Sequence, residues 1–168
     1  MFMYAITGHT DGIGKHLYQH LSPNAIGFSR SNGYDITNRD DRLKILHDAS
    51  HCNVLINNAY AGFGQSEMLM DAFYKWGSTN KTIINVGSRI AEQSLPSRLD
   101  SGLLTYQMHK VSLKHLCKDL NAYGCNLNIK YVWFGYVGTE KILAKYPNMT
   151  EKMYISVDEA VEKILECV

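Results

Sequence analysis

Tyr106 and Lys110 stand four residues apart in the segment TYQMHK, which begins at residue 105. On a helix, positions i and i+4 lie on one face, so a phenol and an ammonium at this spacing can converge on one point. A free tyrosine has a pKa of about 10, which is poorly placed for proton transfer at neutral pH, and a nearby ammonium lowers it by favouring the phenolate. The pair is either a proton-transfer site or two ordinary polar residues on a wet surface, and the spacing alone does not distinguish these interpretations.

A glycine-rich segment, TGHTDGIG, follows an apolar run near the N-terminus and leads into a helix-like pattern. Its glycines, Gly8, Gly12 and Gly14, permit a tight turn and the close approach of a pyrophosphate. The free N–H groups and the dipole of a helix N-terminus stabilise such an anion. The segment predicts a dinucleotide phosphate turn, and the alternative is a glycine-rich turn without a ligand.

The next predicted strand ends in GFSRS, where a dinucleotide-binding fold keeps the residue that contacts the adenosine ribose. An acidic residue there holds the ribose of NAD, whereas a hydroxyl and a guanidinium suit the 2′-phosphate of NADP. Ser29 and Arg30 therefore favour NADP(H), although a surface arginine is the alternative interpretation of Arg30. Asp11, an anion inside the phosphate turn, counts slightly against NADP(H).

Strand-length apolar runs alternate with helix-length amphipathic segments, which predicts an α/β fold in which helices cover both faces of a parallel sheet. The predicted strands are 2–7, 25–29, 53–57, 82–86 and 127–134. The predicted helices are 12–21, 39–49, 65–76, 105–123 and 156–167. Right-handed crossovers order such a sheet as a doubly wound (Rossmann) fold. Because only five residues separate Ser29 from Asp35, any strand at 34–36 must be vestigial or joined without its helix.

Two helices carry clearer signals than the others. The helix at 105–123 has an apolar stripe at Leu113, Leu116, Cys117 and Leu120, the spacing of a buried face. The last helix opens with SVDE, in which Ser156 and Glu159 form a capping-box pattern.

Composition limits the function classes. The 168 residues suffice for one domain, taken as 1–168, and the 45% hydrophobic and 20% charged content is typical of a soluble globular protein. A net charge of +1 favours neither nucleic acid nor an anionic membrane, and the apolar runs are too short to span a bilayer. Four scattered cysteines without a CxxC pair, and an N-terminus unlike a signal peptide, predict a cytoplasmic protein.

The seven histidines raise the question of a metal site. His16/His20 and His47/His51 are i, i+4 pairs, but neither is followed by the glutamate of a zincin helix. No cysteine or acidic cluster completes a set of four ligands, so we expect no metal and interpret both pairs as solvated helix faces.

Several segments together resemble the short-chain dehydrogenase/reductase family over nearly the whole chain. They are TGHTDGIG, YDIT, LINNA, INVGS, YQMHK and FGYVGT, in the family's order. The resemblance implies that Ser88 hydrogen-bonds the substrate oxygen, Tyr106 is the acid/base, and Lys110 holds the nicotinamide ribose and acidifies the phenol. It implies a cofactor site made of Gly8, Thr10, Asp11, Gly12, Ile13, Gly14, Ser29, Arg30, Asp35, Ile36, Asn58, Ala59, Tyr106, Lys110, Val137 and Thr139.

The chain also departs from the family pattern. Tyr60 replaces the last glycine of NNAG and is expected to crowd the cofactor wall, and Phe134 replaces a proline. The helix at 65–76 has no asparagine for the family's proton relay, and no closing strand follows the last helix, so the fold is expected to be truncated there. Residues 91–102 and 139–153 are expected to line the substrate pocket.

The leading hypothesis is an NADP(H)-dependent oxidoreductase that interconverts a carbonyl and an alcohol on a small molecule. An alternative is a protein of the same fold that senses NADP(H) with little or no turnover, which the missing asparagine and closing strand favour. A sugar-nucleotide epimerase or dehydratase would use the same tyrosine and lysine but would need a C-terminal substrate domain. The family's interfaces predict a homodimer through the helices at 65–76 and 105–123, with Met108 and His115 on the outer face and a monomer as the competitor.

Overall fold

Five parallel strands form the centre of the computed structural model, which describes residues 2–94 and 101–168. The strands are β1 (Tyr4–Thr7), β2 (Ala25–Phe28), β3 (Val54–Asn57), β4 (Thr82–Ser88) and β5 (Asn128–Phe134). They lie in the order β2-β1-β3-β4-β5, and every neighbouring pair is parallel. This topology confirms the predicted doubly wound α/β fold.

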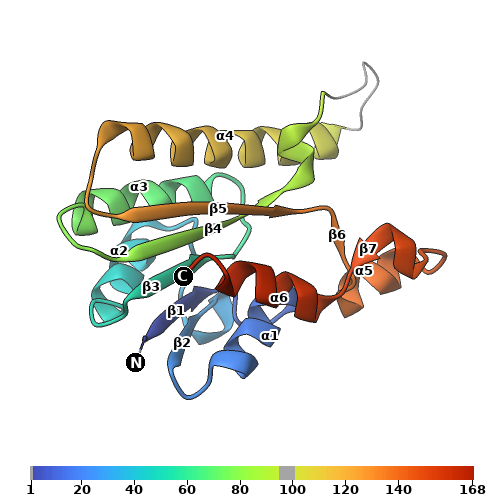
Figure 1. The fold of residues 1–168 in the computed structure, drawn as a ribbon, viewed down its shortest axis with the longest axis horizontal. Helices are drawn as coiled ribbons and strands as arrows, with labels where there is room; N and C mark the ends of the chain where they lie inside the picture. The colour runs from blue at the N-terminus through green and yellow to red at the C-terminus, as the bar shows by residue number, and fades with distance from the viewer. Residues whose placement is uncertain (1, 95–100) are drawn as a thin grey trace.

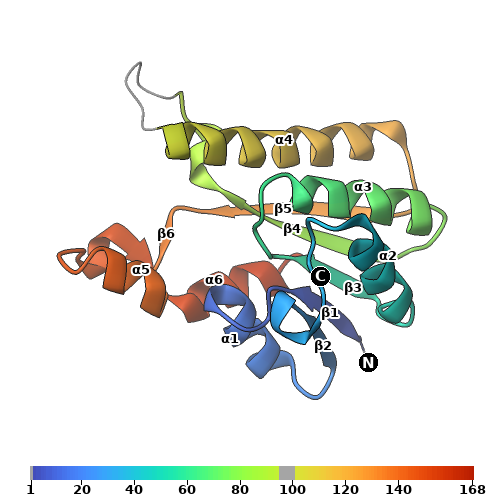
Figure 2. The same cartoon turned by 180° about the vertical axis from the view of Figure 1, so that it is seen from behind.

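Helices cover both faces of the sheet (Figure 1). One face carries α1 (Gly12–Leu21) and α6 (Val157–Leu165), and the other carries α2 (Arg39–Asp48), α3 (Gly64–Trp76) and α4 (Ser101–Tyr123), as Figure 2 shows from behind. Alternate strand residues point to opposite faces, so a strand buried on both sides must be apolar throughout. In β3, for example, Leu55 joins the core under α2–α4, whereas Val54 and Ile56 join the core under α1 and α6.

No α-helix lies in the segment that joins β2 to α2. A single 3₁₀ turn, η1 (Arg30–Asn32), follows β2, and the structure assigns no strand to residues 34–36. The vestigial strand considered from the sequence is therefore absent, and β2 is an edge strand. The stretch at Asp35 and Ile36 instead lies between the end of β2 and the start of α2.

The chain beyond β5 folds into small elements that the sequence pattern did not predict. Two short strands, β6 (Tyr136–Val137) and β7 (Tyr154–Ile155), pair in parallel, and between them lie α5 (Glu140–Lys145) and the 3₁₀ turn η3 (Glu151–Met153). These segments are too short to show a period in the sequence. They extend past the carboxyl ends of the main strands (Figure 1) and form a wall beside the edge where open α/β sheets bind ligands.

The element boundaries otherwise follow the prediction within a few residues. The strand β4 runs two residues further, to Ser88, and is followed by the 3₁₀ turn η2 (Arg89–Glu92), while α4 begins four residues earlier, at Ser101. The predicted pocket segment 91–102 lies partly outside the described residues. Across 2–94 and 101–168, no helix is both long and apolar enough to cross a membrane.

Candidate functional site

Ser88, Tyr106 and Lys110 meet at the carboxyl edge of the sheet. Ser88 ends β4, while Tyr106 and Lys110 lie on successive turns of α4, which packs against β4. The Ser88 hydroxyl lies near enough to the Tyr106 side chain to favour its phenolate, and the Lys110 Nζ lies 5.8 Å from the centre of the Tyr106 ring. The structure thus brings together the three residues to which the family resemblance gave catalytic roles.

The pKa of Tyr106 is raised, because burial disfavours the phenolate more than the hydrogen bond from Ser88 favours it. The nearby lysine predicted the opposite direction, and that prediction is wrong for this geometry. The Lys110 ammonium is engaged elsewhere and does not hydrogen-bond the phenol. A phenol that keeps its proton at neutral pH is the form that a proton donor needs.

Lys110 is buried, with 4% of its surface exposed. Its Nζ donates to Gln65 Oε1 at 2.8 Å and to the Val86 carbonyl oxygen at 3.0 Å. Both acceptors are neutral, so burial lowers the pKa of the amine to about 8. Lys110 therefore changes charge close to physiological pH.

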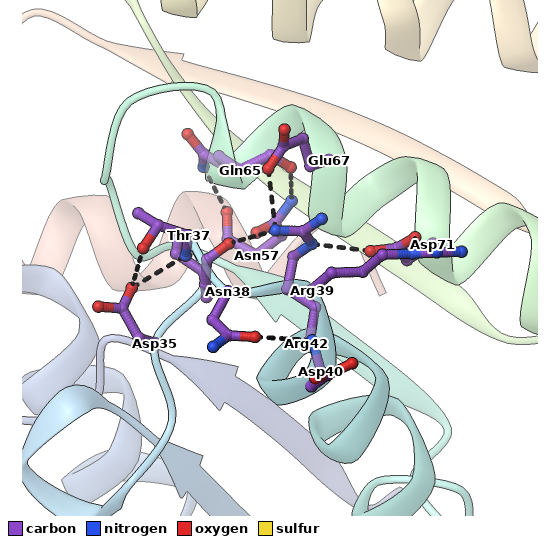
Figure 3. Close-up of polar contacts among 11 residues, drawn as sticks. Asp35, Thr37, Asn38, Arg39, Asp40, Arg42, Asn57, Gln65, Glu67 and Asp71 are labelled. Carbon is purple, nitrogen blue, oxygen red and sulfur yellow. Dashed lines mark hydrogen bonds and ion pairs between the residues drawn. The ribbon is translucent and has the colours of Figure 1, made fainter.

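Gln65 belongs to a buried amide network that sequence reasoning did not identify. Its Nε2 donates to the Asn57 and Val86 carbonyl oxygens at 2.6 and 2.9 Å, and Asn57 Nδ2 donates to the Gln65 carbonyl oxygen at 2.8 Å (Figure 3). Asn57 Nδ2 also donates to Asn85 Oδ1 at 2.9 Å. The available signal was the amide side chains that interrupt two apolar strands, INN and INV. The helix α3 has no relay asparagine, but its second residue contacts the candidate catalytic lysine directly.

Tyr60 packs against Tyr106, and its expected crowding of the cofactor stays a prediction. Its ring packs edge-on against Tyr106 with centroids 4.9 Å apart, and the Lys110 Nζ lies 5.3 Å from its centre. Its hydroxyl group is 3.0 Å from His109 Nδ1, within hydrogen-bonding distance. His109 had no predicted role.

The glycine turn has the geometry that a phosphate-binding turn requires. Gly8 has a φ of +72°, and a Cβ on Gly14 would lie 2.1 Å from the Gly8 carbonyl oxygen, so neither position accepts a side chain without strain. Asp11 caps α1, and its Oδ1 accepts a hydrogen bond from the Gly12 N–H at 2.7 Å. Thr139 approaches the same turn, with its Cγ2 3.6 Å from where a Gly12 Cβ would be. Thr10 and Ile13 lie within this turn and the first turn of α1.

Thr7 hydrogen-bonds Asn58 and Ala59, which lie beside the glycine turn. The sequence indicated Thr7 only as the end of a strand. The N–H groups of Asn58 and Ala59 both donate to Thr7 Oγ1 at 3.0 Å, and Asn58 Nδ2 donates to the Thr7 carbonyl oxygen at 3.1 Å. Val137 ends β6, two residues before Thr139. The predicted phosphate turn and the predicted cofactor residues Asn58, Ala59 and Thr139 therefore lie at one edge of the sheet.

The predicted adenosine side lies at the end of β2. Arg30 is exposed and lies close enough to Asp35 to lower the pKa of its carboxyl group, although the larger cause is hydrogen bonding. Asp35 Oδ1 accepts hydrogen bonds from the Thr37 N–H and hydroxyl at 2.9 and 2.8 Å (Figure 3). The Ser29 hydroxyl hydrogen-bonds Ser31 Oγ at 2.8 Å. Ser29, Arg30, Asp35 and Ile36 all lie in the segment between β2 and α2, and their cofactor contacts stay predictions.

Arg42 hydrogen-bonds the segment between β2 and α2, and the sequence did not indicate this role. Its guanidinium donates to the Ile36 carbonyl oxygen at 2.9 Å, to Asp71 Oδ2 at 2.7 Å and to Glu67 Oε2 at 2.8 Å (Figure 3). In the sequence, an arginine within a polar helix such as α2 is typical of a surface residue, and only the packing of α3 against α2 buries it.

The histidine pairs gather no metal-binding set in this structure. In the described ranges, no group of three His, Cys, Asp or Glu side chains is close enough to hold a metal ion. His47 lies 3.1 Å from the Asp48 carboxylate on the exposed face of α2.

Comparisons with known proteins agree with this architecture. No protein-family model and no curated protein sequence matches the chain. A solved short-chain dehydrogenase from Burkholderia cenocepacia, in complex with NADP, aligns with a TM-score of 0.78 at 22% identity over 98% of this chain and 82% of that one. A 4-hydroxyisoleucine dehydrogenase complexed with NADH aligns with a TM-score of 0.69 at 15% identity over 98% and 90% of the two chains. A short-chain dehydrogenase/reductase from Caenorhabditis elegans, solved with cofactor, aligns with a TM-score of 0.70 at 15% identity over 97% and 86%.

Proposed function

Starting from the short-chain dehydrogenase/reductase fold of this chain, we propose that it is a nicotinamide-dependent oxidoreductase that interconverts a carbonyl and an alcohol on a small molecule. One observation carries the proposal: the Ser88 side chain lies close to Tyr106, one helical turn from the buried Lys110, next to a glycine turn shaped for phosphates. When bound, the cofactor supplies or accepts the hydride.

The roles of the side chains follow from their positions. Ser88 holds the substrate oxygen, and Tyr106, whose raised pKa keeps it protonated, gives its proton to that oxygen during reduction. Lys110 holds the nicotinamide ribose as a cation below a pH of about 8. Gln65 fixes the direction of the Lys110 side chain through the 2.8 Å hydrogen bond between them.

The cofactor that the loop after β2 suits best is NADP(H). Arg30 is exposed at the end of β2, where its guanidinium could meet a 2′-phosphate, and no carboxylate occupies the Ser29 position. Asp11 opposes this assignment only weakly, because its carboxylate is already bound to the Gly12 N–H.

Tyr106→Phe tests the proposed chemistry. We expect turnover of NADPH with a carbonyl substrate to fall about 10²- to 10⁴-fold, because only the transferable proton is lost. NADPH affinity, measured by fluorescence titration, is expected to stay within a factor of about three. Tyr123→Phe, an exposed phenol on the same helix, is the matched control. A near wild-type rate for Tyr106→Phe would remove the tyrosine from the mechanism.

A sensor that binds NADP(H) with little turnover is the second candidate. The packing of Tyr60 against Tyr106 favours it, since this ring lies beside both the phenol and the Lys110 ammonium. Tyr60→Gly restores the glycine found in the resembling family. A large gain in NADPH turnover for this variant over a broad carbonyl panel, with an inactive wild type, would favour the sensor.

The proposed assembly is a homodimer through α3 and α4. Leu104 and Met108 are exposed on α4, and Phe63 is exposed just before α3, so apolar side chains are available for a partner on this side. Light scattering is expected to give about twice the 19.0 kDa mass of the chain, and Met108→Glu is expected to yield the monomer. A mass four times that of the chain would contradict the proposed interface. A cytoplasmic location, suggested by four free cysteines, stays a prediction.

A further inference from the structure

A cleft of about 510 Å³ opens at the end of β5, beside the β6–β7 pair, and its lining residues are not among the site residues described above. Three of its lining side chains are basic, Arg89, Lys152 and Lys163, and none is acidic. Aromatic rings form much of the remaining wall and come from Trp133, Phe134, Tyr136 and Tyr154. None of the residues assigned to the cofactor lines it.

The cleft lies next to the candidate catalytic serine. Ser88 pairs with Phe134 in the sheet register, Arg89 follows Ser88 directly, and Gly135 follows Phe134. The Arg89 guanidinium lies over Gly135, with its Cζ 3.3 Å from where a Cβ of Gly135 would be. The glycine thus leaves space for the guanidinium at the mouth of the cleft, one residue from Ser88.

Two of the cations have no compensating charge. Among the described residues, the side chains of Arg89 and Lys152 make no hydrogen bond or ion pair, whereas the Lys163 Nζ lies 2.9 Å from Glu159 Oε1. A guanidinium presents a planar fork of donors that matches a carboxylate, and aromatic walls suit a flat apolar body. One free arginine assisted by one lysine fits a single carboxylate.

We propose that this cleft binds the substrate of the proposed reaction, and that this substrate is a carboxylate-bearing carbonyl compound with an aromatic body. The reaction in this inference rests on the proposed function, whereas the class of ligand rests only on the residues that line the cleft. Reduction adds to the carbonyl carbon one hydride from the reduced nicotinamide that the proposed function supplies. It adds to the carbonyl oxygen one proton from Tyr106, which regains it from solvent. The product is a hydroxy acid.

The test compares 4-oxo-4-phenylbutanoate with its uncharged primary amide. Calorimetric titration of the full chain, with and without NADP⁺, is expected to show at least about tenfold tighter binding of the acid. Arg89→Gln is expected to weaken acid binding about 10- to 100-fold, the range of a charge-assisted contact, and to leave amide binding unchanged. Lys118→Gln, an exposed cation on α4, is the control and should change neither. Trp133 supplies a second readout, since quenching of its fluorescence by the acid reports occupancy of the cleft, while the other tryptophan, Trp76, is buried.

Equal affinities for acid and amide, no binding of either at millimolar concentration, or equal losses in Arg89→Gln would overturn the proposal. Inorganic phosphate that binds as tightly as the acid would overturn the aromatic part of it. The proposed function fails separately: if the acid binds through Arg89 but NADPH is not oxidised with it or with neutral carbonyls, the carboxylate site stands and the oxidoreductase does not. NADPH oxidation with neutral carbonyls and with the acid that is in both cases insensitive to Arg89→Gln would support the oxidoreductase and reject the carboxylate site.

Discussion

Helix α3 separates two buried cations, Arg42 on its α2 side and Lys110 on its α4 side, and they differ in their partners. Both are almost inaccessible, at 5% and 4% exposure. Arg42 contacts two carboxylates, of Glu67 and Asp71, and one carbonyl oxygen. Lys110 contacts one amide oxygen, that of Gln65, and one carbonyl oxygen.

The difference separates a structural cation from one available for chemistry. The carboxylates beside Arg42 neutralise it locally and fasten the loop at Ile36 to α3 (Figure 3). Lys110 has no carboxylate partner among the described residues, so its burial is uncompensated and its pKa falls to about 8. A buried charge without a counter-ion costs folding free energy, and such a cost is typical of residues that serve a ligand.

The largest effect is expected from removing Arg42, the buried cation with carboxylate partners. Arg42→Met is expected to lower the free energy of unfolding by about 3–5 kcal/mol, because it leaves the largely buried Asp71 carboxylate without its closest partner. Urea denaturation measures this change. Arg39→Met is the matched control, since Arg39 contacts Asp71 at 3.8 Å with a side chain that is 74% exposed, and about 0–1 kcal/mol is expected. A loss below about 1 kcal/mol for Arg42→Met would show that the ion cluster does not hold α2 to α3.

The next effect concerns a third, exposed cation, which is free to meet a ligand. Arg30→Ala is expected to weaken NADPH binding by about 1.5–3 kcal/mol, or roughly ten- to a hundred-fold, and to leave NADH binding nearly unchanged. Titration of both cofactors against both proteins measures the gap. Arg39→Ala, an exposed arginine at the start of α2, controls for lost surface charge. Equal affinities of the wild type for NADPH and NADH would remove the NADP(H) assignment.

A smaller effect is expected on the pH dependence of the rate when Lys110 is given a carboxylate partner like those of Arg42. The reductive rate with NADPH is expected to fall above a pH of about 8, as Lys110 loses its proton, while Tyr106 with its raised pKa stays protonated. Gln65→Glu places a carboxylate at the position now 2.8 Å from Nζ, which favours the ammonium and should move this alkaline limb up by about one pH unit or more. Gln65→Met lacks that charge and should not move the limb upward. If the alkaline limb of the pH–rate profile does not move in Gln65→Glu, then the ionisation of Lys110 does not cause it.

The smallest effect is on stability. Lys110→Met is expected to change the free energy of unfolding at pH 7 by no more than about 1 kcal/mol, because relief of the buried charge offsets the lost hydrogen bond to Gln65. The folded-state pKa of Lys110 lies below the ordinary 10.5, so the folded protein carries the cost at low pH. That cost is relieved as pH rises from about 8 to about 10.5. Between pH 8 and 10.5 the wild type should therefore gain stability relative to Lys110→Met in urea denaturation. If the difference in free energy of unfolding between the two proteins does not change over this range, the buried charge of Lys110 is not uncompensated.

The sequence by itself determined the order of strands and helices along the chain and where the candidate site residues lie on them. Alternating apolar runs and the glycine turn are local signals, since the periods of strands and helices and the needs of a tight turn are set within a few residues. Ser88, Tyr106 and Lys110 could be placed in this way because strand ends and helical turns carry their side chains to the sheet edge. The short elements α5, β6 and β7 could not, because two to six residues show no period.

Only the tertiary structure decided which polar groups share a buried environment. Arg42 and Lys110 both occupy positions that the sequence pattern indicates as polar, and α3 buries both by packing between α2 and α4. The contact between Gln65 and Lys110 joins residues 45 positions apart, and it engages the ammonium that the residue spacing directs toward the phenol. The direction of the Tyr106 pKa depends on the balance of burial against one hydrogen bond, and that balance is a property of the packed molecule that residue spacing does not contain.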